Sequence, residues 1–327
     1  PTTVATWNIG GDFDFSSGTI TVLGTGTGEI IFNGGTTQTY QKSFGNIQNL
    51  VNFSVSNNST LDVGTSLIDG STGSFTLNSD CGIITANEQG LSTTAGTGSL
   101  QLLGAKNLNT NANYTYDGTI AQVTGNALPP TVRDLTIDNT NGVTLTNSVS
   151  ISNILDLVDG NLILQTSDLR INSFPIVGAT STSYIVADNS GTLTQRVIGT
   201  DMDFPVGTAT SYLPITLRNV GIPDFYSVRI IENVLEDGTS GAPIADIDEC
   251  VNATWVVDEE TQGGSDLVVT VQWKGVNEGT GFNRISCGIG CHDGIDWQTE
   301  TTSGSAGGTN PYTRSRNGVL GVGSFAV

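Results

Sequence analysis

The sequence predicts an all-β protein: a right-handed parallel β-helix (β-solenoid) followed by an immunoglobulin-like β-sandwich. Three observations lead to this fold class. Hydrophobic residues make up 36% of the 327 residues, mostly in alternating patterns, and no long stretch has the i, i+3, i+4 apolar spacing of a helix. Short apolar pairs recur in series through the first part of the chain. Longer alternating segments, richer in aromatic residues, follow after about Gly199.

The short apolar pairs are clearest in LVDGNLILQTSDLRI, Leu157 to Ile171. Two apolar residues separated by a single residue mark a strand with one buried face, because side chains alternate across a strand. Earlier pairs are Leu135 and Ile137, Val143 and Leu145, Val149 and Ile151, and Leu155 and Leu157. Asn, Gly, Asp and Ser, which tolerate turn geometry, separate them. Three such strands in roughly 20 residues describe one coil of a β-helix.

A longer internal repeat supports the β-helix. The matched segments are EIIFNGGTTQTYQ (Glu29–Gln41) with YTYDGTIAQVTG (Tyr114–Gly125), NFSVSNN (Asn52–Asn58) with DLTIDNT (Asp134–Thr140), and GSFTLNS (Gly73–Ser79) with GNLILQT (Gly160–Thr166). The matches keep their order and predict two copies of a multi-coil module. We therefore assign residues 1–199 to the β-helix, with nine or ten coils in a rod of about 45 Å.

Residues 200–327 carry longer strand patterns, which are YLPITLRNV, FYSVRIIENV, ATWVVDEE and DLVVTVQWKG. Trp255, Trp273 and Trp297 all lie in this part of the chain. Several strands at this spacing with buried tryptophan are typical of an immunoglobulin-like sandwich.

The order of motifs also resembles a known group of proteins. FNGGTTQTYQ, DLTIDNTNGVTLTNSVSISNILDLVDGNLIL, DFPVGTATSYLPITL, WVVDEE, VTVQWKGVNEGTGFNR and the ending GSFAV occur in this order. They resemble large, adhesin-like surface proteins of the Bacteroidota that use type IX secretion. The resemblance implies an extracellular or cell-surface location. In that group a C-terminal sorting domain commonly follows the sandwich. The sequence stops at Val327 without one, so we expect either that this domain is removed on export, as the resemblance implies, or that the sequence is cut short.

Charge narrows the class of partner. The formal net charge is -20, from 31 acidic and 11 basic residues, which argues against nucleic acid and anionic lipid. The sequence has no run of about 18 apolar residues, so we expect no membrane-spanning segment. An acidic, hydroxyl-rich chain suits an extracellular protein that has to stay soluble.

Few residues suggest catalysis, and we expect no enzyme. The single histidine, His292, follows Cys291 directly, and adjacent side chains on a strand point to opposite faces, which argues against a Cys–His dyad. We expect His292 to be an exposed loop histidine. A zinc site there lacks a fourth ligand. The acids expected on the helix are Asp134, Asp138, Asp156, Asp159 and Asp168, near Arg133 and Arg170. Their spacing matches no pattern that we expect of a glycosidase.

Two further groups are candidate sites. Asp237, Asp246, Asp248 and Glu249 lie on one polar loop and are weak calcium ligand candidates, the alternative to a protein without cofactors. Four cysteines, Cys250, Cys287, Cys291 and Cys81, are disulfide candidates with three complete pairings open.

The leading functional hypothesis is a non-enzymatic structural or adhesive protein of the cell exterior that assembles head-to-tail into a filament. The terminal coil of a β-helix leaves backbone groups unpaired, so the segment TWNIGGDFDF offers subunit contacts at Trp7, Ile9, Phe13 and Phe15. Its partners are then copies of itself, or glycans of a cell surface or matrix. The alternative is a carbohydrate-binding or polysaccharide-degrading protein with Trp297 or Tyr312 as the sugar platform.

Overall fold

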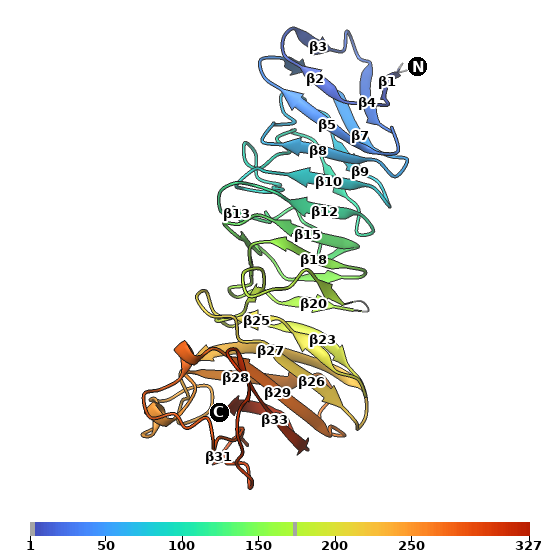
Figure 1. The fold of residues 1–327 in the computed structure, drawn as a ribbon. Coiled ribbons are helices and arrows are strands. Elements are labelled where there is room, and N and C mark those ends of the chain that lie inside the picture. Colours follow the sequence, from blue (N-terminus) through green and yellow to red (C-terminus); the bar gives the residue numbers. More distant parts are fainter. Residues whose placement is uncertain (1–3, 173–174) are drawn as a thin grey trace. The chain divides into compact units, whose positions relative to one another are not determined.

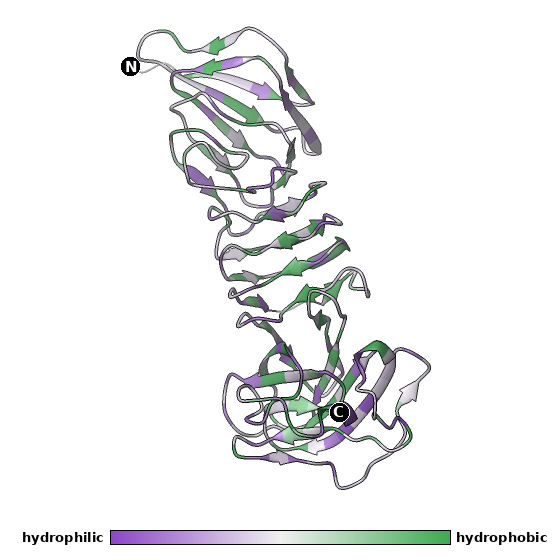
Figure 2. Cartoon of the chain, turned by 90° about the vertical axis from the view of Figure 1, so that its left-hand side faces the viewer, coloured by the Kyte–Doolittle hydropathy of each residue, from purple (hydrophilic) through white to green (hydrophobic). Residues whose placement is uncertain are grey.

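The computed structural model describes residues 4–172 and 175–327 and confirms an all-β chain with a β-solenoid of about nine turns (Figure 1). The chain divides into two compact units. Unit 1 is Pro1–Ile163 with Phe174–Ala179, and unit 2 is Leu164–Ser173 with Thr180–Val327. In both units, apolar and polar residues alternate along the strands (Figure 2).

Unit 1 is a stack of coils with parallel sheets on three faces. The first face is β1 (Val4–Ile9), β4 (Thr27–Phe32), β7 (Val51–Val55), β9 (Phe75–Leu77) and β11 (Lys106–Leu108), with the pair β14 (Thr131–Val132) and β17 (Val149–Ile151). The second is β2 (Phe13–Phe15), β5 (Thr37–Lys42), β8 (Thr60–Gly64), β10 (Gly82–Thr85), β12 (Asn113–Tyr116), β15 (Asp134–Asp138), β18 (Leu155–Asp159) and β21 (Ile176–Val177). The third is β3 (Thr19–Thr21) with β6 (Asn46–Gln48), and β13 (Gln122–Val123) with β16 (Val143–Thr144) and β19 (Leu162–Ile163).

The parallel register places apolar residues of successive coils above one another, in columns inside the coils. Ile30 pairs with Phe53, and Phe53 pairs with Phe75, and all three side chains are buried. The predicted apolar pairs Leu135/Ile137, Val149/Ile151 and Leu155/Leu157 are buried in the same way, which confirms the one-sided strands. Burial of these columns is the main stabilising term of such a coil.

Asparagine and aspartate make the corners, as the sequence predicts. Asn57 and Asp80 have φ values of 57° and 63°, a left-handed conformation that these two residue types tolerate. The Asn57 side chain also donates a 2.9 Å hydrogen bond to the Asn33 carbonyl of the previous coil. The corner residues therefore turn the chain and tie successive coils together.

The internal repeat corresponds to a shared corner built on a buried glutamine. Gln38 Oε1 accepts from Gly34 N at 2.9 Å, and its Nε2 donates to two carbonyl oxygens of the preceding coil at 2.8 and 2.6 Å. Gln122 Oε1 accepts from Gly118 N at 2.7 Å, and its Nε2 donates to two earlier carbonyls at 3.0 Å each. Gln38 is the second residue of β5 on the second face, whereas Gln122 is the first residue of β13 on the third face. The repeat thus preserves a corner, and not a fixed face of the coil.

Unit 2 starts with coil strands and continues into two antiparallel sheets. The coil strands are β20 (Leu169–Ile171) with β23 (Leu193–Val197), and β22 (Ile185–Val186) with β25 (Val206–Gly207). One sheet continues from β23 through β27 (Asp224–Glu232), β28 (Ala253–Glu259), β34 (Gly323–Ala326) and β30 (Gly290–His292) to β31 (Trp297–Gln298). The other is β24 (Met202–Phe204), β26 (Ile215–Asn219), β29 (Leu267–Trp273), β33 (Tyr312–Val319) and β32 (Gly307–Gly308). Two 3-10 turns, η1 (Ile247–Glu249) and η2 (Gly275–Asn277), lie in the connections.

Strand β23 joins the two kinds of sheet within unit 2. It pairs in parallel with β20 on one side and antiparallel with β27 on the other. Arg170 on β20 strengthens this junction, because its guanidinium makes two hydrogen bonds to the Glu260 carboxylate, at 2.9 and 3.1 Å, and lies 3.9 Å from the Phe225 ring centroid. The last coil therefore has no open edge at β23.

The core of unit 2 lies between its two antiparallel sheets. Trp255 of β28 and Trp273 of β29 are fully buried, as the sequence predicts. Across the sheets, Asn219 Nδ2 of β26 donates to the Tyr226 hydroxyl of β27 at 2.9 Å. Trp297 at the sheet edge is only half-buried, and its indole N–H donates to the Leu235 carbonyl at 2.8 Å.

Candidate functional site

The first coil of unit 1 is the candidate functional site, because its three strands are all edge strands. β1, β2 and β3 each end their sheets, so each presents one row of backbone N–H and C=O groups without a strand partner among the described residues. Such rows are templates for pairing with another chain. β1 is exposed at five of its six residues, whereas β4 beside it buries every second residue.

The apolar interior of the coils opens at the same place. Trp7 pairs with Ile30 and so belongs to the column that continues through Phe53, yet 55% of its surface is exposed. A pocket of about 200 Å³ lies beside it. Its lining is mainly apolar and comprises Ala5, Trp7, Ile20, Thr21, Val22, Gly28, Glu29, Ile30 and Val51. At the first coil, part of the apolar interior of the coils is therefore exposed.

Of the four predicted contact residues, the structure exposes Trp7 most. Ile9, Phe13 and Phe15 are half-buried. Phe13 stacks on Tyr40 with the ring centroids 5.6 Å apart, so much of its ring supports the second coil. The sequence pattern missed Val4, Leu23 and Phe44, which are exposed near the same end.

The first coil is also acidic. Asp12, Asp14 and Glu29 are the charged residues before Lys42, and no Lys or Arg occurs among them. Two first coils brought face to face would place these carboxylates near their own copies, which is unfavourable. A basic or neutral surface fits this end better than a second acidic one.

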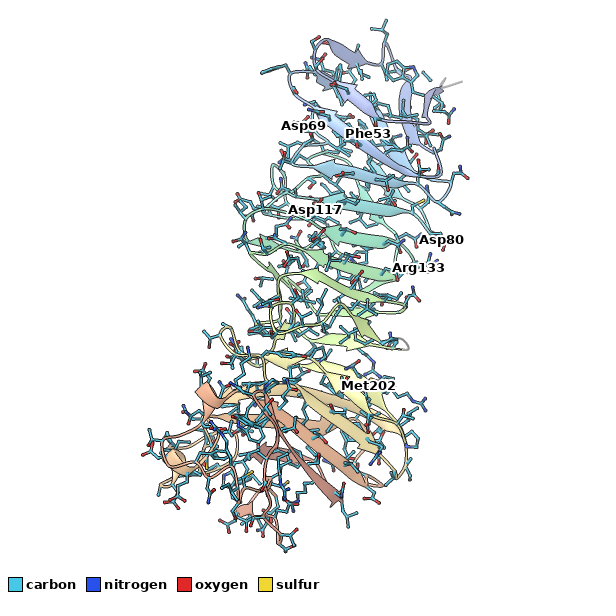
Figure 3. All side chains as sticks on the ribbon, viewed as in Figure 1. Phe53, Asp69, Asp80, Asp117, Arg133 and Met202 are labelled. Atoms are coloured by element: carbon cyan, nitrogen blue, oxygen red, sulfur yellow. The ribbon has the colours of Figure 1, made fainter. Side chains whose placement is uncertain are left out.

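Two of the five carboxylates predicted on the coils, Asp134 and Asp168, tie neighbouring coils together. Asp134 Oδ1 accepts from Asn153 Nδ2 at 2.6 Å, and Asp168 Oδ1 accepts from the Thr192 hydroxyl at 2.9 Å. Arg133 donates to Asp80 Oδ1 at 3.0 Å, and these two side chains lie together at one corner in Figure 3. Asp138 pairs in register with Asp159.

Asp117 is a carboxylate that sequence reasoning did not select (Figure 3). It follows β12, is half-buried, and its Oδ1 is buried without a hydrogen-bond partner. Burial, and then the negative charges of Asp62 and Asp138, raise the pKa of the Asp117 carboxyl above its ordinary value. Asp117 could be found from sequence only by aligning it with Asp138 through the coil register.

We expect Asp117→Asn to stabilise unit 1 at pH 7. The Asp117 pKa is higher in the folded than in the unfolded chain, so stability falls as pH rises from the ordinary Asp range, about 4, through the raised pKa. The neutral amide removes this loss. Thermal unfolding from pH 3 to 8 should show a Tm gain for Asp117→Asn at pH 7 that disappears towards pH 3. A gain that is equal at every pH would contradict the charge explanation, and Asp14→Asn, at an exposed position of β2, serves as the control.

The calcium candidates do not converge in the structure. Asp248 and Glu249 lie in η1, and the Asp237 carboxylate accepts a 3.4 Å hydrogen bond from Ser240. Within residues 4–172 and 175–327, no three His, Cys, Asp or Glu side chains, Asp246 included, are grouped as a metal site.

All four cysteines, Cys81, Cys250, Cys287 and Cys291, are thiols, so the predicted disulfides have no counterpart in the structure. Cys287 forms an isolated bridge with Gly304 and Cys291 lies in β30, so CGIGC does not make the tight turn that could join them.

The prediction of an exposed loop histidine is wrong. His292 ends strand β30, is buried, and packs edge-on against Trp297 with the ring centroids 5.4 Å apart. Its Nδ1 accepts a 3.1 Å hydrogen bond from Gly294 N. The alternation of the strand, and not the polar loop after it, decides the burial of this side chain.

The comparisons with known proteins add no assignment. No protein-family model, curated protein or solved structure matches this chain. No helix in the described part of the chain is long and apolar enough to span a membrane.

Proposed function

We propose that this protein is a non-enzymatic structural or adhesive protein of the cell exterior that assembles head-to-tail through its first coil. The observation that carries this proposal is the first coil itself, where three edge strands surround an uncovered section of core containing Trp7. Covering this end requires strands that continue the sheets and an apolar surface that closes the core.

The proposed partner is the C-terminal part of a second copy. Strand β23 shows how a coil edge is covered in this fold, since β27 of an antiparallel sheet pairs with it. In that part of the chain, β24, β31 and β32 are themselves edge strands. Contact between two different surfaces of identical chains is heterologous and leads to an open polymer unless it closes into a ring.

Charge favours the C-terminal part of a second copy, and not the first coil of that copy, as the partner of the first coil. Residues 270–327 are balanced, with Lys274, Arg284, Arg314 and Arg316 against Glu278, Asp293, Asp296 and Glu300. They are therefore the better electrostatic match to an acidic first coil in a chain of net charge -20.

Two finer assignments belong to the same proposal. The two antiparallel sheets of unit 2 are assigned as an immunoglobulin-like sandwich, on the basis of their face-to-face core with Trp255 and Trp273. Export by type IX secretion and an extracellular site of action are supported by the resemblance to surface proteins of the Bacteroidota. The acidic composition agrees with both.

Trp7→Glu is expected to weaken self-association by at least about 30-fold, because a buried interface tryptophan contributes about 2 kcal/mol or more. Sedimentation velocity over a wide concentration range should give growing species for the native chain and monomers for the variant.

Leu103→Glu is the matched control, since Leu103 is 73% exposed elsewhere on unit 1. A native chain that stays monomeric at every concentration would refute the proposal. So would an equal loss of association in the Trp7 and Leu103 variants. A mixture of Trp7→Glu chains with native chains tests the two binding surfaces separately. The variant keeps its C-terminal surface but lacks a functional first coil, so it should cap native assemblies and shorten them.

A further inference from the structure

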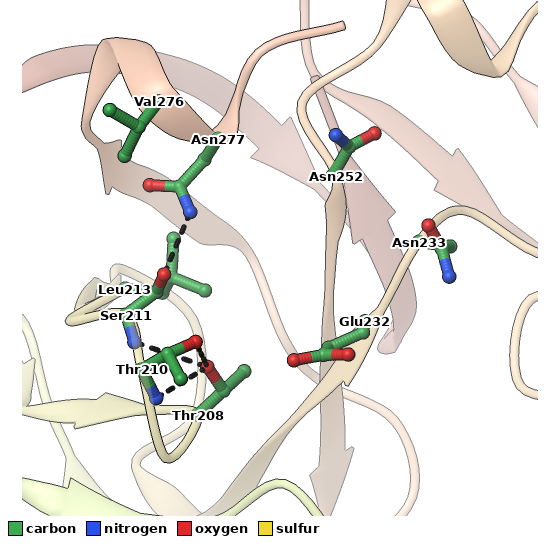
Figure 4. Close-up of a pocket in the computed structure, with 9 residues that line it drawn as sticks. All are labelled: Thr208, Thr210, Ser211, Leu213, Glu232, Asn233, Asn252, Val276 and Asn277. Carbon is green, nitrogen blue, oxygen red and sulfur yellow. Dashed lines mark hydrogen bonds between the residues drawn. The ribbon is translucent and has the colours of Figure 1, made fainter.

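Unit 2 contains a polar pocket lined by several segments of the chain. The pocket has a volume of about 210 Å³. Its lining comes from four segments and comprises Thr208, Thr210, Ser211, Leu213, Glu232, Asn233, Asn252, Val276 and Asn277 (Figure 4). The segments are the turn after β25, the end of β27, the residue before β28, and η2.

Hydrogen bonds hold the walls of the pocket in place. Thr208 Oγ1 accepts from Ser211 N at 3.2 Å and closes the first turn. Asn277 Nδ2 then donates to Ser211 Oγ at 2.9 Å, which connects η2 to this turn. On the far side, Asn252 N donates to the Asn277 carbonyl at 2.7 Å. The pocket is thus preorganised, which lowers the entropic cost of binding.

Several polar groups of the lining are left for a ligand. The Glu232 carboxylate and the side-chain amides of Asn233 and Asn252 make no hydrogen bond to another residue in the described part of the chain. Figure 4 shows the Glu232 carboxylate directed towards Thr208 across the pocket. One carboxylate, amides and hydroxyls together supply both donors and acceptors.

The chemistry of this lining defines the class of ligand. Adjacent hydroxyl groups of a sugar both donate and accept, so they match a carboxylate flanked by amides and hydroxyls. The negative charge of Glu232 disfavours acidic sugars. A single carboxylate is a poor basis for a calcium site, which takes six to eight oxygens.

Apolar contact and size complete the match. Val276 is 85% exposed at the lining, so its side chain can contact the C–H groups of a ring. The volume suits one sugar ring, because it lies below the range of drug-sized sites, about 300–1,000 Å³. We propose that this pocket binds one neutral sugar unit of a glycan, independently of the self-association proposed above.

The test is a titration of the full chain, in the monomeric Trp7→Glu background, by saturation-transfer NMR. The probes are the methyl glycosides of glucose, galactose, mannose and N-acetylglucosamine, with methyl glucuronide as the acidic comparison. We expect saturable binding of at least one neutral glycoside with a Kd on the order of 1 mM, and about tenfold weaker binding of the glucuronide. This background keeps the outcome separate from the success or failure of polymer formation.

Glu232→Ala should weaken the binding about tenfold or more, because it removes the charged acceptor. Glu236→Ala, at an exposed glutamate four residues further on, is the matched control and should bind as the parent chain does. The proposal is overturned if none of the neutral glycosides shows saturable binding. It is equally overturned if the Glu232 and Glu236 variants bind alike, since the sugar would then occupy another site.

Discussion

Replacement of Phe53 by alanine is expected to lower the free energy of unfolding of unit 1 by about 4 kcal/mol. Phe53 is fully buried at the centre of an inward column, between Ile30 and Phe75 (Figure 3). Its ring also meets Tyr40 edge-on, with the centroids 6.3 Å apart. Parallel pairing fixes the backbone on both sides, so the coil cannot collapse around the cavity and most of the lost contact stays lost.

Urea unfolding followed by far-UV circular dichroism measures this effect. Ser54→Ala is the control, because Ser54 is the next residue on the same strand and points to the other face. The control should change stability by less than about 0.5 kcal/mol. If Phe53→Ala cost no more than Ser54→Ala, the inward columns would not be the stabilising feature of the coils.

The Gln122→Leu variant is expected to lose about 4 kcal/mol as well, for a different reason. Gln122 is buried and holds Gly118 N and the carbonyls of Thr85 and Asn87, and it also accepts from Asn139 Nδ2 at 2.8 Å. Leucine keeps the volume but leaves these groups buried without partners, and each such group costs about 1–3 kcal/mol.

Gln38→Leu is the informative comparison. Gln38 makes the equivalent bonds, but its carbonyl partners belong to Ile9 and Gly11 of the first coil, where water can replace the lost partner. The loss should therefore be smaller at Gln38 than at Gln122, when both are measured by urea unfolding. An exposed control, Gln89→Leu, should be close to neutral. Equal losses at Gln122 and Gln89 would show that the glutamine corner is not a stabilising element.

The sequence was informative where the chain repeats a physical requirement. Period-two apolar pairs such as Leu155 and Leu157 must face a core, and Asn57 and Asp80 must turn a corner, so coils and corners were predictable. The similarity between the segments that contain Gln38 and Gln122 could be seen in the sequence, but the structural role of the two glutamines could not. Only the register shows that each amide spans two carbonyls of the coil before it.

What the sequence could not provide is how distant segments meet. The polar pocket of unit 2 joins Thr208 with Asn277, and no local pattern links residues so far apart. His292 was expected in an exposed loop, whereas it ends strand β30, which pairs with β34, and is buried. Trp7 is 55% exposed because β1 is an edge strand among the described residues, and an alternating pattern does not by itself mark which strand lies at an edge.

The pairing of β23 has a consequence for biosynthesis. A chain emerges from the ribosome with its N-terminus first, so β20 and β23 are made before β27 exists. Until Asp224–Glu232 has been synthesised, the outer edge of β23 has no strand to pair with. A nascent chain halted before that segment carries an open, apolar-backed edge, the kind of surface that recruits chaperones or aggregates. Translation of β27 therefore ends the period in which this edge of unit 2 is vulnerable.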